Sequence, residues 1–269
     1  MTNKQKSYSR ALVSVLGKTK MNVLRKPWYS SLIIFLIWLI VIMRVQDLPF
    51  IVHHRPFYQF LGKSISILEL ESLIFFLGAV VYLKWWQHVG LKSPNDLRNL
   101  SLWWLPCLFL LGYLLLILSA GLPPTRILMV ILINTLMIGI CEELLFRGIL
   151  FYGASSSFGT RSAVWITSII FGVVHINSGF ITGDFNASLI QVFNAFMFGF
   201  CAVALRIRLD TLIPGIIFHW LWDFWTDLTH FNVYSIVEIK SSLIYIAFFL
   251  YGLWLLREDV PKDTMTNHK

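Results

Sequence analysis

Long and nearly uncharged apolar segments are the feature of this sequence that most restricts its fold. A helix needs about 20 residues to cross a hydrocarbon core about 30 Å thick. The clearest example, LWWLPCLFLLGYLLLILSAG, begins at Leu102 and contains no charged residue. By this criterion the chain contains about eight candidate spans. They run approximately over residues 29–44, 66–86, 102–120, 127–151, 161–180, 186–206, 211–229 and 240–256.

The composition leads to the same conclusion. Hydrophobic residues make up 57% of the 269 residues and charged residues only 13%, whereas soluble domains carry about 25% charged residues. So little charge cannot cover the surface of a soluble enzyme, and the composition also excludes a disordered chain and a nucleic-acid-binding module. A transmembrane β-barrel, with its polar lumen, would be far less apolar. We therefore predict an all-α fold, a polytopic transmembrane helical bundle of about eight spans.

The positions of the basic residues predict the orientation of this bundle. The net charge is +8, and seven Lys and Arg precede the first apolar segment. Such residues concentrate in cytoplasmic segments, where they contact anionic lipid headgroups. We predict a basic cytoplasmic tail over residues 1–28, a single transmembrane domain over 29–256 and a cytoplasmic tail over 257–269, in the cell membrane. Membrane lipid is an expected partner and nucleic acid is not.

Ionisable residues within the spans are concentrated in three of them. Each costs roughly 2.5–3.5 kcal/mol at the bilayer centre, so it persists where it faces a cavity, has a partner or performs a function. The residues are Glu142, Glu143 and Arg147 in the fourth segment, His175 in the fifth, and His219 and Asp223 in the seventh. We expect the three helices to bring these groups together around one hydrated pocket.

The spacing of the acidic pair suggests two different roles. Glu143 and Arg147 are four residues apart, so they share a helix face and can pair. Glu142 is turned from Glu143 by about 100° on a helix with 3.6 residues per turn. It therefore keeps no cation from its own helix, which suits it to act as a general base.

The two histidines also have neighbours at helical spacing. Asp223 lies four residues after His219, so it can accept a hydrogen bond from one ring nitrogen and fix the tautomer of the ring. Phe171 lies four residues before His175. We predict that Phe171 walls the same side of the pocket.

Three short motifs carry a resemblance to a known family. EELLFR, FGVVH and HWLWD resemble, in this order, the signatures of the type II CAAX prenyl endopeptidases, also called the CPBP or Abi family. The family pattern is E-E-x-x-x-R, F-x-x-x-H and H-x-x-x-N or D, on separate transmembrane helices. The likeness covers residues 127–229, which we take as the CPBP-like core. Each motif is weak alone, but three in order within apolar segments are fairly specific.

The resemblance implies an intramembrane endopeptidase of the glutamate type that needs no cofactor. Glu142 would activate water together with His175, and His219 and Asp223 would hold the oxyanion of the tetrahedral intermediate. The implied substrate is a membrane-associated peptide or a lipidated protein, of the CAAX type or the leader or bacteriocin type. The supporting residues would be Glu143, Arg147 and Phe171.

Two polar residues each have two possible roles in the site. Well-studied prenyl-protein members of the family carry Asn where this chain has Asp223. An ionised Asp cannot donate a hydrogen bond to an oxyanion, so Asp223 would have to be protonated or would act by orienting His219. Asn194, in the sixth segment, would support the site by lining the cavity or would merely bond to a neighbouring helix.

Other protease chemistries give weaker matches. Zinc held by Glu142, His175 and His219 is an alternative, because two His and a carboxylate match a catalytic zinc shell. The H-E-x-x-H motif of many zinc proteases is absent. The run at residues 153–156, GASS, superficially resembles a rhomboid serine motif, and we interpret it as a turn.

A different class of function is also compatible with the sequence. Members of the family that resemble this chain are linked to bacteriocin self-immunity, so the pocket would bind a peptide without cutting it, or the protein would serve as a membrane scaffold. A transporter ranks last, because no paired broken helices suggest an inverted repeat.

Overall fold

The computed structural model describes residues 26–45, 62–232 and 238–257, and within these ranges every regular element is helical. The predicted all-α fold is confirmed. The elements are α2 (Pro27–Val45), α4 (Ile67–Leu83), the 3₁₀ helix η1 (Leu97–Trp103), α5 (Trp104–Ala120), α6 (Thr125–Glu142), the π-helix η2 (Glu143–Leu150), α7 (Phe151–Phe158), α8 (Thr160–Val174), α9 (Asn177–Thr182), α10 (Phe185–Leu209), α11 (Ile213–Asn232) and α12 (Glu238–Leu255).

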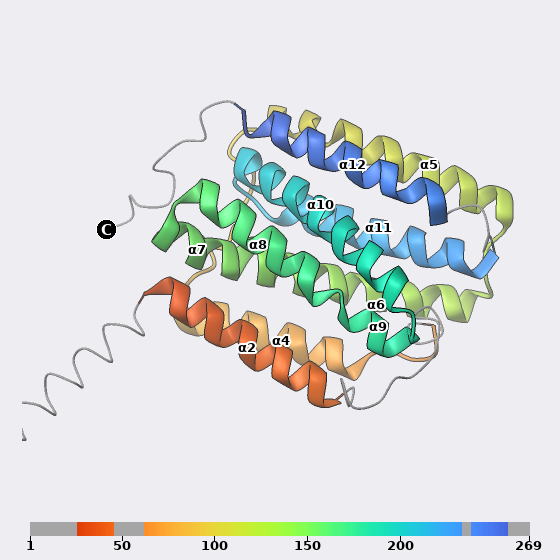
Figure 1. The fold of residues 1–269 in the computed structure, drawn as a ribbon, viewed down its shortest axis with the longest axis horizontal. Helices are drawn as coiled ribbons and strands as arrows, with labels where there is room; N and C mark the ends of the chain where they lie inside the picture. Colours follow the sequence, from red (N-terminus) through yellow and green to blue (C-terminus); the bar gives the residue numbers. More distant parts are fainter. Residues whose placement is uncertain (1–25, 46–61, 233–237, 258–269) are drawn as a thin grey trace, which may run out of the picture.

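The helices lie in successive layers (Figure 1). Helices α2 and α4 form the first layer and pack against the second, which contains α6, η2, α7 and α8. Helices α10 and α11 form the third layer, and α5 with α12 covers it from the other side. The second and third layers are thus enclosed from both sides, and all six ionisable residues of the three motifs lie in their helices or at a helix end.

Each of the eight predicted spans coincides with a helical segment of the structure. Five segments are long and apolar enough to cross a membrane by length and composition, which agrees with a multi-pass membrane protein. These five are Pro27–Arg44, Leu97–Ser119, Thr125–Phe158, Thr160–Thr182 and Phe185–Leu209. That α4, α11 and α12 also cross the membrane stays a prediction, as does the orientation of the chain. Most of the two predicted tails lies outside the described residues.

Local signals in the sequence explain where several helices begin. Ser66 precedes α4, and its hydroxyl accepts a hydrogen bond from the backbone N–H of Glu69 at 3.3 Å, as expected for the Ser-x-x-Glu capping pattern. Asp184 caps α10 in the same way, accepting from the N–H of Ala187 at 2.9 Å. Glu69 and Glu71 therefore lie in the first turns of α4.

One buried amide fixes the chain before α4 against α6. The side chain of Asn134 is fully buried, accepts a hydrogen bond from the N–H of Ser66 at 2.9 Å and donates one to the carbonyl of Ser64 at 2.9 Å. A buried amide with satisfied hydrogen bonds is stable in an apolar interior, whereas an unpaired one is costly. The start of α4 is thereby held beside the middle of α6.

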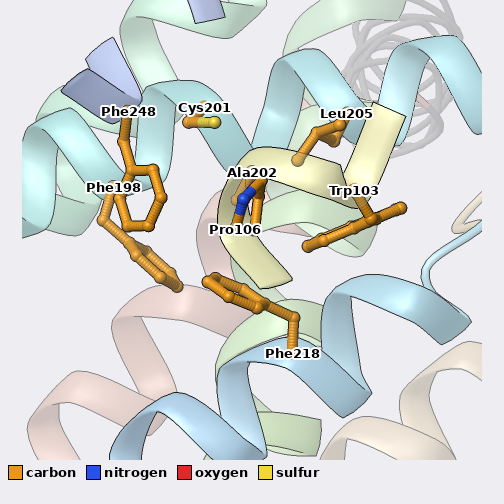
Figure 2. Close-up of a pocket in the computed structure, with 8 residues that line it drawn as sticks. All are labelled: Trp103, Pro106, Phe198, Cys201, Ala202, Leu205, Phe218 and Phe248. Carbon is orange, nitrogen blue, oxygen red and sulfur yellow. The ribbon is translucent and has the colours of Figure 1, made fainter. Parts of the chain in front are cut away.

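A small cavity lies where η1, α5, α10, α11 and α12 meet (Figure 2). Aromatic side chains dominate its wall, including Trp103, Phe198, Phe218 and Phe248. Its free space is about 10 Å³, at or below what one water molecule needs. We interpret it as a packing defect and not as a ligand site.

Candidate active site

Close packing of α6 on α11 creates the framework of the site. A Cβ atom at Gly139 would lie 3.0 Å from the backbone nitrogen of Trp220 and 3.2 Å from its Cα. Only glycine lets the two backbones approach this closely. The indole N–H of Trp220 also donates to the carbonyl of Leu132 at 3.0 Å. One turn beyond this contact, Glu143 from the helix after α6 meets His219 from α11.

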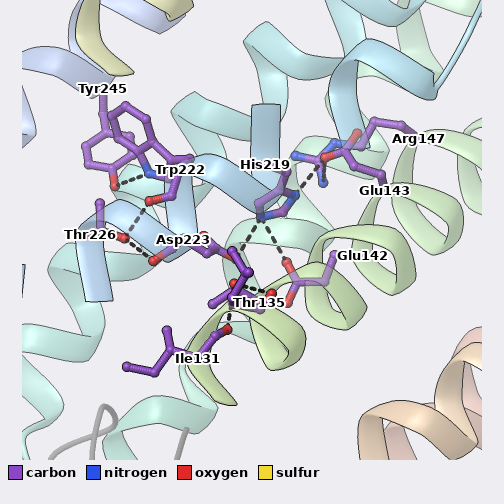
Figure 3. Close-up of polar contacts among 11 residues, drawn as sticks. Ile131, Thr135, Glu142, Glu143, Arg147, His219, Trp222, Asp223, Thr226 and Tyr245 are labelled. Atoms are coloured by element: carbon purple, nitrogen blue, oxygen red, sulfur yellow. Dashed lines mark hydrogen bonds and ion pairs between the residues drawn. The ribbon is translucent and has the colours of Figure 1, made fainter. Parts of the chain in front are cut away.

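A buried chain of charges connects the first and third motifs (Figure 3). Arg147 and Glu143 are 1% and 2% exposed, and their side chains approach to 3.2 Å between Nη1 and Oε1. The same Oε1 lies 2.9 Å from Nδ1 of His219. Because a carboxylate only accepts, Nδ1 must carry the proton. Glu143 therefore orients His219 and favours its positively charged form.

The other ring nitrogen of His219 faces two further carboxylates. Its Nε2 atom lies 3.6 Å from Oε2 of Glu142 and 3.5 Å from Oδ2 of Asp223. The side chains of Glu142 and Asp223 are 23% and 25% exposed, whereas that of His219 is 5% exposed. The buried imidazole thus presents one nitrogen to a space lined by two accessible acids.

This geometry corrects the predicted role of Asp223. The sequence suggested that Asp223 fixes the tautomer of His219, but their 3.5 Å separation is too long for a good hydrogen bond. The shorter contact comes from Glu143, at 2.9 Å. The helical spacing correctly placed Asp223 beside the ring, but the orienting carboxylate belongs to another helix.

The second motif places His175 at the end of α8. Its Nδ1 lies 2.6 Å from the backbone carbonyl of Phe171. A carbonyl oxygen only accepts, so Nδ1 carries a proton and Nε2 of a neutral ring is left free to accept one. His175 is half-buried and lies within electrostatic reach of Glu142 and His219.

Phe171 acts as a partition inside the site. Its ring centroid lies 4.8 Å from that of His175 and 6.1 Å from that of His219. The guanidinium carbon of Arg147 lies over the same ring, 3.9 Å from its centroid. This is the range of a cation–π contact, which is worth more where water is excluded. Phe171 therefore connects the second motif to the buried Arg147.

A glycine and a second phenylalanine on α10 complete this partition, and neither was singled out from the sequence. A Cβ at Gly199 would lie 2.9 Å from Cδ1 of Phe171 and 3.3 Å from Nη2 of Arg147. The ring of Phe198 lies 4.9 Å from that of His219. Nothing in a single sequence distinguishes these two residues from other members of an apolar helix.

Two acidic residues near the site were also missed. Asp227 follows Asp223 by four residues on α11 and lies within its electrostatic reach. Glu69 on α4 lies within electrostatic reach of Glu142, and its backbone carbonyl is 3.6 Å from Sγ of Cys141. The i,i+4 repeat of acids on α11 was a signal that could have identified Asp227.

Among the described residues, Asn194 forms no hydrogen bond with the cluster of charges. It is half-buried on α10, one turn before Phe198, and none of the hydrogen bonds found among the described residues includes its side chain. Its supporting role stays a prediction.

The serine-rich run at 153–156 is helical, so its interpretation as a turn was wrong. It lies within α7, where the hydroxyl of Ser155 donates to the carbonyl of Tyr152 at 3.1 Å and that of Ser156 to the carbonyl of Gly153 at 2.8 Å. Serine hydroxyls of this kind bond back to the preceding turn, which lets serine continue a helix.

We next consider whether the side chains of the site are placed to bind a metal ion. A zinc ion needs ligand atoms at about 2.0–2.2 Å. Across the described ranges, no group of three or more His, Cys, Asp or Glu residues is arranged to hold a metal ion. The alternative zinc set of Glu142, His175 and His219 thus does not form a ready-made metal site in this structure, and we derive no step through a metal.

A comparison with protein families agrees with the motifs. Residues 124–225 match the family model described as type II CAAX prenyl endopeptidase Rce1-like. This segment is therefore similar to an Rce1-like domain. It begins just before α6 and ends within α11, so it contains all three motifs and nearly the whole predicted core at 127–229. Searches of curated proteins and of solved structures gave no match to the chain.

Proposed function

We propose that this protein is an intramembrane endopeptidase of the glutamate type. The Rce1-like domain belongs to a protease family, which supports peptidase activity in general. The single observation that carries the finer proposal is the position of His219. Glu143 holds Nδ1 at 2.9 Å, while Nε2 faces Glu142 and Asp223.

In the proposed reaction, Glu142 takes a proton from a water molecule as that water attacks the scissile carbonyl carbon. His175, with a free Nε2, holds or shares that proton. Removal of a proton by a positioned base contributes about 10²–10⁴ in rate. When the C–N bond breaks, the proton passes to the leaving amine, so protons balance over the cycle.

The developing oxyanion requires a donor on the other side of the carbonyl. A protonated His219 supplies an Nε2–H there, and the buried Glu143 compensates its charge. Removing one donor of this type costs about 10²–10³ in rate. Asp223 lies beside the same nitrogen, where, when protonated, it supports the reaction as a second donor.

The proposed substrate is a peptide bond in a membrane-associated peptide or lipidated protein. The acids lie between helices that are otherwise apolar, so a substrate segment would reach them from the membrane or its surface. We further propose that both termini are cytoplasmic and that no metal takes part.

The test compares purified, lipid-reconstituted wild type with Glu142→Gln on a panel of prenylated CAAX peptides and leader peptides. Cleavage is measured by mass spectrometry with and without a chelator. Glu71→Gln is the matched control, because Glu71 is an exposed carboxylate on α4. We expect Glu142→Gln to lose about 10²–10⁴ in rate with unchanged thermal unfolding, and Glu71→Gln to retain activity.

Three outcomes would contradict the proposal. Cleavage that survives Glu142→Gln would refute the role of that residue. Cleavage stopped by a chelator and restored by zinc would refute a metal-free reaction. Peptides that wild type and Glu142→Gln bind equally, and that neither cleaves, would favour the non-catalytic immunity or scaffold function.

A further inference from the structure

A groove lies outside the candidate active site, between α8 and α12. Both helices pack on α10, and a hollow of about 170 Å³ separates them at the end of the bundle where α8 begins and α12 ends, at the left of Figure 1. We call it the α8–α12 groove. It is lined mainly by Arg161, Val164, Trp165, Phe200, Leu253 and Leu256.

The floor and the inner end of this groove are apolar. Phe200 of α10 is 1% exposed and forms the floor. The ring of Trp165 packs on Phe200 with centroids 4.9 Å apart and approaches Phe249 of α12 at 6.3 Å. These aromatic contacts close the groove towards the middle of the bundle. Leu253, 41% exposed, forms part of the opposite wall.

The outer end of the groove is basic. Arg161 stands in the first turn of α8, is exposed, and forms no ion pair with any described residue. Thr160 beside it also lines the groove, and the first N–H groups of a helix have no partner within the helix. Arg257 follows the groove residue Leu256 and stacks on Trp254 at 4.7 Å. Two exposed arginines thus lie at this end of the bundle, Arg161 where α8 begins and Arg257 just after α12 ends.

We propose that the α8–α12 groove binds an anionic phospholipid, with the phosphate at Arg161 and part of one acyl chain between Trp165 and Leu253. Basic pockets between transmembrane helices bind anionic headgroups, and tryptophan is enriched at headgroup depth. The volume is smaller than the 300–1,000 Å³ typical of sites that enclose a whole small molecule. A lipid needs no such enclosure, because the bilayer covers the rest of it.

An anionic lipid fits the groove better than a free phosphate or a zwitterionic lipid does. An inorganic phosphate would use Arg161 alone and leave the aromatic and leucine walls exposed. A zwitterionic lipid would use the walls but gain less from the arginines, since its headgroup carries no net charge. Only an anionic lipid satisfies both ends of the groove.

The experiment measures lipid binding to the purified full-length protein by native mass spectrometry. Phosphatidylglycerol and phosphatidylcholine with identical acyl chains are titrated separately, together with inorganic phosphate. We expect wild type to prefer phosphatidylglycerol, and Arg161→Gln to weaken that binding about fivefold, from the roughly 1 kcal/mol that one basic residue contributes near an anionic surface. Arg98→Gln is the control, because Arg98 is 91% exposed and paired with Asp96 outside the groove.

A second variant tests the apolar part of the groove independently. Leu253→Trp adds bulk to a wall residue that is already partly exposed, so it should occupy the groove without disturbing the fold. We expect weaker phosphatidylglycerol binding with unchanged thermal unfolding. Equal binding of the two lipids by wild type, equal losses in the Arg161 and Arg98 variants, binding of inorganic phosphate as tight as that of the lipid, or full lipid binding by Leu253→Trp would each overturn the proposal.

Discussion

The buried pair of Arg147 and Glu143 offers the sharpest test of the structure. Both side chains are at most 2% exposed, and 3.2 Å separates Nη1 from Oε1. Arg147 also lies 3.9 Å above the ring of Phe171. Substitution Arg147→Met keeps much of the volume but leaves the carboxylate of Glu143 buried, with the imidazole of His219 as its remaining partner among the described residues.

The expected magnitude follows from the missing charge. Breaking a buried ion pair by removing one partner costs about 3–5 kcal/mol, because the remaining charge is uncompensated. The double variant Glu143→Gln with Arg147→Met removes both charges and should regain a large part of this loss. We expect a coupling energy of about 2 kcal/mol between the two sites.

The assay is equilibrium unfolding in mixed micelles of detergent and denaturing detergent, followed by circular dichroism. Arg98→Met serves as the control, because Arg98 is 91% exposed and its pair with Asp96 lies in water, where an ion pair adds little to stability. If Arg147→Met were no more destabilising than Arg98→Met, or if the double variant were as unstable as the sum of the single ones, the buried pair would not exist as described.

Three further predictions concern the motif, the helix contact and the outer surface. Asp223→Asn should keep peptide cleavage within about tenfold of wild type, because an amide can donate to an oxyanion, and a complete loss of cleavage would contradict this. Gly139→Ala should destabilise the bundle by about 1–3 kcal/mol through overpacking, whereas Gly78→Ala, with no atom within 4 Å of the added Cβ, should not; equal effects in thermal unfolding would refute the close contact. Burial raises the pKa of Asp210, but the hydrogen bonds from Lys92, Arg206 and Asn95 and the charge of Arg206 together outweigh burial and hold that pKa below the usual value. The ionised carboxylate therefore stabilises the fold above its usual pKa, and this stabilisation is lost as the pH falls below about 4. Asp210→Asn should make the stability to unfolding less dependent on pH in that acid range. An unchanged pH dependence would disprove the linkage.

The positions of the helices along the chain could be predicted largely from the length of the apolar segments. A segment such as that beginning at Leu102 must be helical in lipid, because no water is present to satisfy its backbone groups. All eight predicted segments are indeed helical. The packing of the helices into the layers of Figure 1 could not be predicted, since every helix is apolar and the contacts that order them depend on shape. The close approach at Gly139 is such a contact.

The local geometry of the fourth span also could not be predicted from the sequence. Residues 143–150 form a π-helix between two α-helices, and all eight are buried. Single π-helical turns are rare and occur frequently at functional sites. The turn of about 100° expected between Glu142 and Glu143 assumed a regular α-helix. The change of helix type begins at Glu143, where the roles of the two acids diverge.

The different surroundings of Glu142 and Glu143 give a physical basis for roles that the motif alone only assigns. Adjacent carboxylates would compete for the same cation if both were buried. Here Arg147 and His219 both contact Glu143, which is 2% exposed. Glu142 keeps 23% of its side chain exposed, and no cation of the described residues lies closer to it than 3.6 Å. A carboxylate already engaged by an ion pair and a hydrogen bond is poorly suited to remove a proton from water. The accessible one, beside an imidazole that its neighbour holds in place, is free to do so.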